Sequence, residues 1–286
     1  MKSAGKPLPD APAKKTNVTS DRPGFPVRLQ SDAGVSSATK KIAVGAHSAS
    51  LSGLNSAKRQ PQNPIPNGLG LDSHAVRTRM VQKLAAQGLS DLQVLAAMGQ
   101  VERHRFVDSA LVNQAYEDTS LPIGLGQTIS KPNVVARMLA LLMRSDEGRT
   151  GKLGRVLEIG TGCGYQAALL GQLATEVYSI ERLRGLHEKA RENLRPFRLP
   201  NVHLLFGDGM VGYAKGAPYA AIISAAGGDA IPQTWIDQLA VGGRLVAPLQ
   251  TANGAQALVV IDKTAQGIRQ SLLEAVHFVP LKSGTS

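Results

Sequence analysis

Three glycines at alternate positions, Gly160, Gly162 and Gly164, carry the clearest chemical signal in this sequence. They follow a short apolar segment at 156–159 and precede a helix-forming run at 166–173. A strand that turns into a helix across glycines lets a ligand approach the backbone, where side chains would block it. The start of such a helix also offers unpaired N–H groups and a partial positive charge. The turn therefore predicts a site for a nucleotide-like ligand, without saying which one.

Acidic residues around this turn narrow the choice of ligand. Glu181 ends the next expected strand about 20 residues further on, where a carboxylate can accept hydrogen bonds from both ribose hydroxyls. Asp208 and Gly209 follow the third expected strand, where an acidic side chain could meet an adenine amino group. Glu158 lies in the strand before the turn, and the resulting E-x-G-x-G-x-G spacing is typical of S-adenosylmethionine-dependent methyltransferases. The G-x-G-x-x-G spacing of nicotinamide dehydrogenases is absent, which disfavours that class.

Several kinds of methyl acceptor are disfavoured by what the chain lacks. Residues 224–229 read Ser-Ala-Ala-Gly-Gly-Asp, where enzymes that methylate exocyclic amines commonly carry an Asn/Asp-Pro-Pro-aromatic motif. Cys163 is the only cysteine, and inside the turn it is better interpreted as a small packed residue than as the nucleophile of a cytosine methyltransferase. A single cysteine excludes an internal disulfide and a thiolate zinc cluster. The six histidines show no ligand spacing, so we expect no metal, and catechol-type enzymes need one.

The elements that would position these residues alternate between strands and helices after residue 155. The expected strands are 155–159, 176–181, 201–206, 219–225, 243–248, 257–262 and 274–280, and the expected helices are 166–173, 183–194 and 232–239. Such alternation predicts an α/β fold, a doubly wound and mostly parallel seven-stranded sheet with helices on both faces. In these sheets the ligand lies beyond the carboxyl ends of the strands, near the switch in strand order.

The segment before the sheet predicts a helical cap and a polar loop. Helices are expected at 72–87, where Asp72 and Ser73 would form the cap, then from 90, near 109–116, and at 133–143. The loop at 121–132 is punctuated by glycines and carries a polar cluster. Pro132 suits the first position of the following helix, and Ser130 by itself would pass for a simple N-cap.

The first 70 residues differ in composition from the rest. They hold eight of the 16 prolines. Their ten basic and three acidic residues contribute +7 to the formal charge of +11 that the whole chain carries. They show no sustained helical or strand period, so we interpret 1–70 as a disordered basic tail and 71–286 as one domain. A basic tail can bind nucleic acid weakly, but it can equally serve only as a solvated extension. No apolar run is long enough for a membrane span, and we expect a cytoplasmic protein.

From about residue 75 to its end the chain resembles the protein-L-isoaspartate O-methyltransferase family. The resemblance rests on 121–132 (LPIGLGQTISKP), 156–166 (VLEIGTGCGYQ), 207–213 (GDGMVGY) with 217–219, and 278–281 (FVPL). The first and third stretches are specific to the family, whereas the cofactor turn is not. The chain departs from the usual pattern at Glu102, Ala220 and Gly227-Gly228, and the last two departures could loosen the loop over the substrate.

The resemblance implies methylation of the free α-carboxylate of L-isoaspartyl residues, and of D-aspartyl residues, in damaged proteins, with S-adenosyl-L-methionine as cofactor. Ser130 would hold the acceptor carboxylate. The residues expected to bind cofactor are Gln127, Thr128, Ile129, Glu158, Gly160, Gly162, Gly164, Glu181, Asp208 and Gly209. The domain would divide into a cap with substrate loop (71–150) and a cofactor-binding sheet (151–286), and the protein would be a monomer without a stable nucleic-acid partner. The alternatives are a methyltransferase acting on another carboxylate or on RNA, and a chaperone-like module that has lost catalysis.

Overall fold

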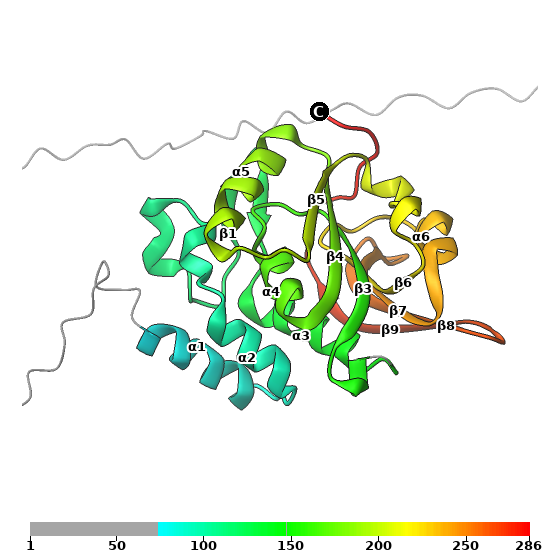
Figure 1. Cartoon of the computed structure of the whole chain (residues 1–286), viewed down its shortest axis with the longest axis horizontal. Coiled ribbons are helices and arrows are strands. Elements are labelled where there is room, and N and C mark those ends of the chain that lie inside the picture. The colour runs from blue at the N-terminus through cyan, green and yellow to red at the C-terminus, as the bar shows by residue number, and fades with distance from the viewer. Residues whose placement is uncertain (1–73, 147) are drawn as a thin grey trace, which may run out of the picture. The chain divides into compact units, whose positions relative to one another are not determined.

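The structure, a computed structural model, describes residues 74–146 and 148–286, and the expected tail at 1–70 lies outside the described residues. Its centre is a seven-stranded sheet with the order β5-β4-β3-β6-β7-β8-β9 (Figure 1). The strands are β3 (Leu153–Ile159), β4 (Ala174–Glu181), β5 (Val202–Phe206), β6 (Tyr219–Ser224), β7 (Leu239–Gln250), β8 (Gln256–Thr264) and β9 (Gly267–Val276). Strands β3 to β7 pair in parallel, and β8 and β9 are antiparallel. The expected mostly parallel sheet is confirmed.

The expected cap before the sheet is formed by the helices α1 (His74–Ala86) and α2 (Leu92–Gln100) and by the 3₁₀ turns η1 (Arg103–Phe106) and η2 (Ser109–Gln114). The remaining α-helices are α3 (Pro132–Met143), α4 (Tyr165–Leu173), α5 (Arg184–Leu194) and α6 (Gln233–Gln238). Helix α2 begins where it does because Asp91 accepts hydrogen bonds from the N–H groups of Gln93 and Val94, both at 3.0 Å. Asp72 and Ser73, which we expected to cap the N-terminus of α1, lie outside the described residues.

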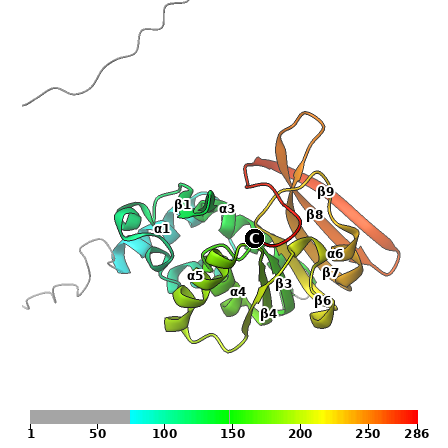
Figure 2. The ribbon, with the colours of Figure 1, turned by 90° about the horizontal axis from the view of Figure 1, so that it is seen from above.

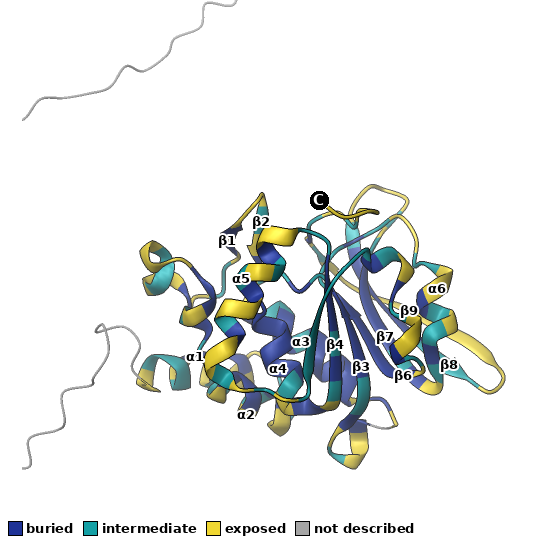
Figure 3. Cartoon of the chain, turned by 45° about the horizontal axis from the view of Figure 1, so that its top comes forward, coloured by how far each residue is buried: buried dark blue, intermediate teal, exposed yellow. Residues whose placement is uncertain are grey.

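Both faces of the sheet are buried, because successive apolar side chains of its central strands enter two clusters on opposite faces. In β3, Val156 packs into one apolar cluster with residues of α3, α4 and α5. Leu157 and Ile159 point the other way, into a second cluster that contains Trp235 of α6. Figure 2 shows α4 and α6 on opposite sides of the sheet, and Figure 3 shows the central strands buried and the loop joining β8 to β9 exposed.

The structure corrects three expectations about the segments around this core. The last strand is Gly267–Val276, not 274–280. The sequence did not indicate its start, because residues 267–275 of this edge strand are all exposed and show no apolar alternation. The segment 121–132 is not a plain loop: β1 (Leu121–Gly124) and β2 (Gln127–Ile129) form an antiparallel hairpin. The interpretation of Ser130 as an N-cap is wrong, since Lys131 holds that position and makes no side-chain cap bond. Pro132 is the first residue of α3, as expected.

Candidate active site

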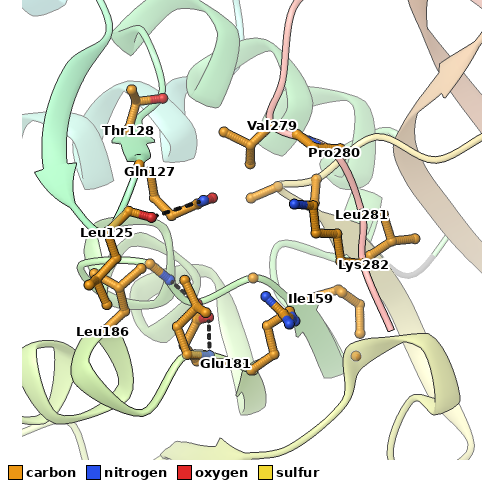
Figure 4. Close-up of a pocket in the computed structure, with 18 of the residues that line it drawn as sticks. Leu125, Gln127, Thr128, Ile159, Glu181, Leu186, Val279, Pro280, Leu281 and Lys282 are labelled. Atoms are coloured by element: carbon orange, nitrogen blue, oxygen red, sulfur yellow. Dashed lines mark hydrogen bonds between the residues drawn. The ribbon is translucent and has the colours of Figure 1, made fainter. Parts of the chain in front are cut away.

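A cavity of about 480 Å³ lies at the carboxyl ends of β3, β4 and β6 (Figure 4). The strand order reverses here, because β4 pairs with one side of β3 and β6 pairs with the other. This is the switch point at which open α/β sheets bind their ligands. Gly160 and Gly162 line the cavity at the end of β3, and Glu181 lines it at the end of β4. Both glycines have positive φ angles, 88° and 57°, so the turn needs residues without a Cβ to reach this shape.

Glu181 is buried and connects the glycine turn to the start of α5. Its Oε2 accepts a hydrogen bond of 2.9 Å from the N–H of Gly162, and its Oε1 accepts one of 2.9 Å from the N–H of Leu183. A carboxylate has about four lone-pair sites, so two remain for ligand hydroxyls. The geometry therefore suits the ribose contact expected for Glu181, and it adds a role in shaping the turn.

The wall opposite the β1–β2 hairpin comes from residues 279–282, which sequence reasoning did not assign to the site (Figure 4). This stretch belongs to a segment, 279–286, that crosses from the loop after β6 to the loop after β4. The N–H of Leu281 bonds to the Gly227 carbonyl at 2.7 Å, and the N–H of Ser286 bonds to the Arg182 carbonyl at 2.9 Å. The FVPL stretch carried a signal, but its apolar pattern predicted a strand. Gly227 thus anchors the 279–286 segment, since its N–H also donates a hydrogen bond of 2.9 Å to the Val279 carbonyl.

Asp208 and Gly209 follow β5 but differ in their access to the cavity. Gly209 lines it, and a Cβ at this position would meet Ile159 Cγ2 at 2.6 Å. The carboxylate of Asp208 accepts hydrogen bonds from the N–H of Met210 at 2.8 Å and from the N–H of Gly284 at 2.6 Å. Asp208 is not among the residues that line the cavity, so its contact with adenine stays a prediction.

Glu158 and Gly164 lie behind the turn rather than in the cavity. Glu158 is fully buried and accepts a hydrogen bond from the Ser179 hydroxyl, which also bonds to the Thr161 hydroxyl at 2.6 Å. Burial raises the pKa of Glu158 to about 8. A Cβ on Gly164 would meet Leu194 of α5 at 3.1 Å. The positions of both residues favour support of the turn, and direct cofactor contacts stay predictions.

The β1–β2 hairpin brings the remaining expected residues to the same place. Gln127 and Thr128 line the 480 Å³ cavity. Thr128, Ile129 and Ser130 line a hollow of about 40 Å³ next to it, which Gly160 and Gly162 share. Ser130 also lines a third hollow of about 280 Å³, bounded on its far side by the end of β9. The second hollow therefore shares lining residues with the first, and it shares Ser130 with the third.

The hydroxyl of Ser130 is available to a ligand. Among the described residues, none forms a hydrogen bond with it, and the side chain is only partly buried. Cys163 lines the small hollow, but it is buried and burial raises its pKa to about 11, so it is a poor nucleophile. Within residues 74–146 and 148–286, which the structure describes, no three His, Cys, Asp or Glu side chains gather as metal ligands would.

The sheet order, the glycine turn and the cavity with Glu181 define the class of S-adenosylmethionine-dependent methyltransferases. Within that class, residues 75–286 match the family model of protein-L-isoaspartate(D-aspartate) O-methyltransferase. The chain belongs to this family.

Individual relatives agree with that assignment. The chain is 62% identical over 231 residues to protein-L-isoaspartate O-methyltransferase of Methylibium petroleiphilum, which covers 80% of this chain and 85% of that one. It is 54% identical to the same enzyme of Ralstonia nicotianae, over 76% and 71% of the two chains. A solved structure of a protein-L-isoaspartate O-methyltransferase superposes with a TM-score of 0.65 at 27% identity, over 72% of this chain and 66% of that one. A Plasmodium falciparum protein crystallised with S-adenosyl-L-homocysteine, 24% identical, shares the fold with a TM-score of 0.63.

Proposed function

We propose that this protein transfers a methyl group from S-adenosyl-L-methionine to the free α-carboxylate of L-isoaspartyl residues, and of D-aspartyl residues, in damaged proteins. The observation that carries the proposal is the set of three hollows that share lining residues, with Ser130 on the wall of two of them. The small hollow would join the cofactor cavity to an acceptor pocket, and Ser130 lines both the small hollow and that pocket. Family membership supports the same chemistry.

The large cavity fits the cofactor in size and in chemistry. About 480 Å³ lies within the range of roughly 300–1,000 Å³ that small-molecule sites occupy. Glu181 would hold the ribose, Gly160 and Gly162 would admit the methionine part, and Gly209 with Asp208 would meet the adenine. Gln127, Thr128 and Ile129 would line the junction with the acceptor. When bound, the cofactor supplies a methyl group on a sulfonium, from which a neutral thioether leaves readily.

The acceptor side needs positioning more than acid–base catalysis. A carboxylate is already an anion at neutral pH, so its methylation requires no general base. Ser130 would donate its hydroxyl proton in a hydrogen bond to one carboxylate oxygen and leave the other oxygen to attack. The first residue of α3 lies two positions later, so the positive end of that helix would favour the anion. Ile123, Ile129 and Val135 line the small hollow and would keep water from the reacting groups.

The product of this reaction would start a repair sequence. The methyl ester is a better electrophile than the free carboxylate, because its methoxy group can leave. The following backbone nitrogen would attack the ester carbonyl and lose its proton, methanol would depart, and a succinimide would form. Hydrolysis of that ring partly restores the normal aspartyl linkage. We further propose that residues 1–70 are not needed for this chemistry, and that the protein acts as a cytoplasmic monomer without a stable nucleic-acid partner. Over the residues that the structure describes, no helix is long and apolar enough to cross a membrane.

The decisive experiment is transfer of labelled methyl from S-adenosyl-L-methionine to an isoaspartyl peptide, with the matching aspartyl peptide as control. We expect methylation of the first peptide only. Absence of transfer while cofactor still binds would favour the chaperone-like alternative, and equal labelling of both peptides would remove the proposed specificity. Deletion of residues 1–70 should leave the activity intact, whereas an activity on RNA that needs the tail would fall and depend strongly on salt.

A further inference from the structure

Arg103 is a fully buried arginine that joins three separate parts of the domain. Its Nε donates a hydrogen bond of 2.8 Å to the Ala115 carbonyl in the helical cap. Its Nη2 donates one of 2.7 Å to the Ser130 carbonyl. Its guanidinium carbon lies 4.8 Å from the centre of the Tyr165 ring, and Tyr165 is the first residue after the glycine turn. A single side chain therefore connects the cap, the Ser130 loop and the helix of the cofactor turn.

The burial of Arg103 is costly without a negatively charged partner. Among the described residues, none forms an ion pair with it. Arginine is rarely buried unless it is paired, because taking its charge out of water costs several kcal/mol. An apolar side chain of similar volume would pack the same space at lower cost. Stability alone therefore does not account for a guanidinium at this position.

The contacts of Arg103 point to the orientation of Ser130. The guanidinium is a rigid planar fork, so two bonds in different directions fix the Ser130 carbonyl relative to Ala115. The ring of Tyr165 supports the flat face of the fork and ties it to the turn that lines the cofactor cavity. Arg103 itself is not among the residues that line any of the three hollows. Its effect on the reaction must therefore pass through the residues that it contacts, and among these Ser130 lines two of the hollows.

We propose that Arg103 is a positioning residue, which holds the Ser130 peptide against the cofactor turn and so aims the Ser130 hydroxyl at the acceptor carboxylate. The inference rests on the proposed function for its kinetic consequences. Its structural consequence, an ordered Ser130 loop, does not depend on the activity.

Two variants of Arg103 and one matched control test the proposal. Arg103→Lys keeps the positive charge but loses the fork. Arg103→Gln removes the charge and offers one shorter amide nitrogen in place of the Nε and Nη2 atoms that now bond to the two carbonyls. The control is Arg105→Lys, the same arginine-to-lysine change at an exposed residue of the same 3₁₀ turn. The Arg105 side chain forms an ion pair with Glu102. We expect kcat for an isoaspartyl peptide to fall about 10- to 100-fold in both Arg103 variants, the scale of a small misplacement of a positioning group. Cofactor affinity should stay within about twofold, and Arg105→Lys should match the unmodified protein.

A double-mutant cycle with Ser130→Ala separates positioning from a general loss of structure. If Arg103 acts through the Ser130 hydroxyl, Arg103→Lys should lower kcat by less than about threefold when that hydroxyl is already absent. An equal loss of kcat with and without the hydroxyl would overturn the proposal. So would a fall in cofactor affinity that parallels the fall in kcat, because it would indicate damage to the whole domain.

Hydrogen exchange provides a test that needs no catalysis. Amides of residues 121–131 should exchange at least about tenfold faster in Arg103→Lys and Arg103→Gln than in Arg105→Lys, because the loop has lost its anchor. Unchanged exchange in this stretch would overturn the proposal even if activity fell. Should the unmodified protein fail to methylate the isoaspartyl peptide, the proposed function would fail, while the exchange data would still decide whether Arg103 orders the loop.

Discussion

Asp208 Oδ2 accepts a hydrogen bond of 2.6 Å from the backbone N–H of Gly284, and this bond ties the 279–286 segment to the turn after β5. Arg182 adds a second tie, since its Nε bonds to the Gly284 carbonyl at 2.9 Å. Residues 279–282 of the same segment form a wall of the cavity proposed for the cofactor. The proposed cofactor site therefore depends on a stretch of chain far in sequence from the glycine turn.

Loosening the tie at Gly284 should weaken cofactor binding. Gly284 has a φ of 75°, a conformation that costs other residues about 1 kcal/mol or more, so Gly284→Ala should detach part of the segment. We expect the dissociation constant for S-adenosyl-L-methionine, measured by calorimetry, to rise about two- to fivefold. Gly254→Ala is the matched control, because Gly254 has a φ of 80° in the turn between β7 and β8 and is also surrounded by open space. Equal affinities of the two variants would contradict the role assigned to the segment.

Removing the Ser130 hydroxyl should slow methyl transfer without affecting cofactor binding. Ser130→Ala loses one positioned hydrogen bond, and we expect kcat to fall about 10- to 1,000-fold. The cofactor affinity of this variant should be nearly unchanged, because Ser130 does not line the large cavity. Ser109→Ala, at an exposed serine in the cap, serves as control. Full activity of Ser130→Ala would remove the role of this hydroxyl.

Glu181 should matter for cofactor binding in two ways. Glu181→Ala removes the expected ribose acceptor and frees the N–H groups of Gly162 and Leu183 that now bond to the carboxylate. Each hydrogen bond to a charged group contributes roughly 1.5–3 kcal/mol, so we expect at least about a tenfold loss of cofactor affinity by calorimetry. Glu192→Ala, at an exposed position of α5, should bind like the unmodified protein. Unchanged affinity of Glu181→Ala would refute the assignment.

Two glycines of the turn should separate binding from stability. Gly160 lines the cavity and has ordinary space for an added methyl group, the nearest atom being Ala225 Cβ at 3.6 Å. Gly164 does not line it and faces Leu194 at 3.1 Å. Each variant should lower the free energy of unfolding, measured in urea, by at least about 1 kcal/mol, because both positions have positive φ angles. Gly164→Ala should lower it more than Gly160→Ala, because its new methyl group meets Leu194. Only Gly160→Ala should also weaken cofactor binding. Loss of affinity confined to Gly164→Ala would reverse this assignment.

Glu158 should make stability fall as the pH rises. Its pKa is raised to about 8 by burial, above the ordinary value of 4.5, so between these pH values the folded state holds a proton that the unfolded state has released. The contribution of Glu158 is fully present below about pH 4.5 and is lost as the pH rises through 8, with a slope of up to about 1.4 kcal/mol per pH unit. Glu158→Gln removes this titration. Urea unfolding at pH 5.5 and 8.5 should show the unmodified protein losing stability relative to this variant, and parallel curves would contradict the prediction.

Much of the cofactor half of the site follows from neighbours in the chain. Gly160, Gly162 and Glu181 lie at the ends of strands whose apolar runs are visible in the sequence, because both faces of the central strands are buried. Parallel strands bring their carboxyl ends to one edge, so recognising the strands was enough to bring these residues together. The hairpin that carries Gln127 and Thr128 was recognised as part of the site by family resemblance, although its strands were not predicted.

What only the folded chain decided depends on contacts between distant residues. β9 is an exposed edge strand, so no alternation marked its start, and the stretch after it was assigned to a strand instead of the cavity wall. Asp208 and Gly284 are 76 residues apart, and Arg103 and Ser130 are 27 apart. No local pattern encodes such pairs, because hydrogen bonds to backbone groups leave no mark on the identity of the partner residue. Only packing of the cap and the 279–286 segment against the sheet brings these groups within bonding distance.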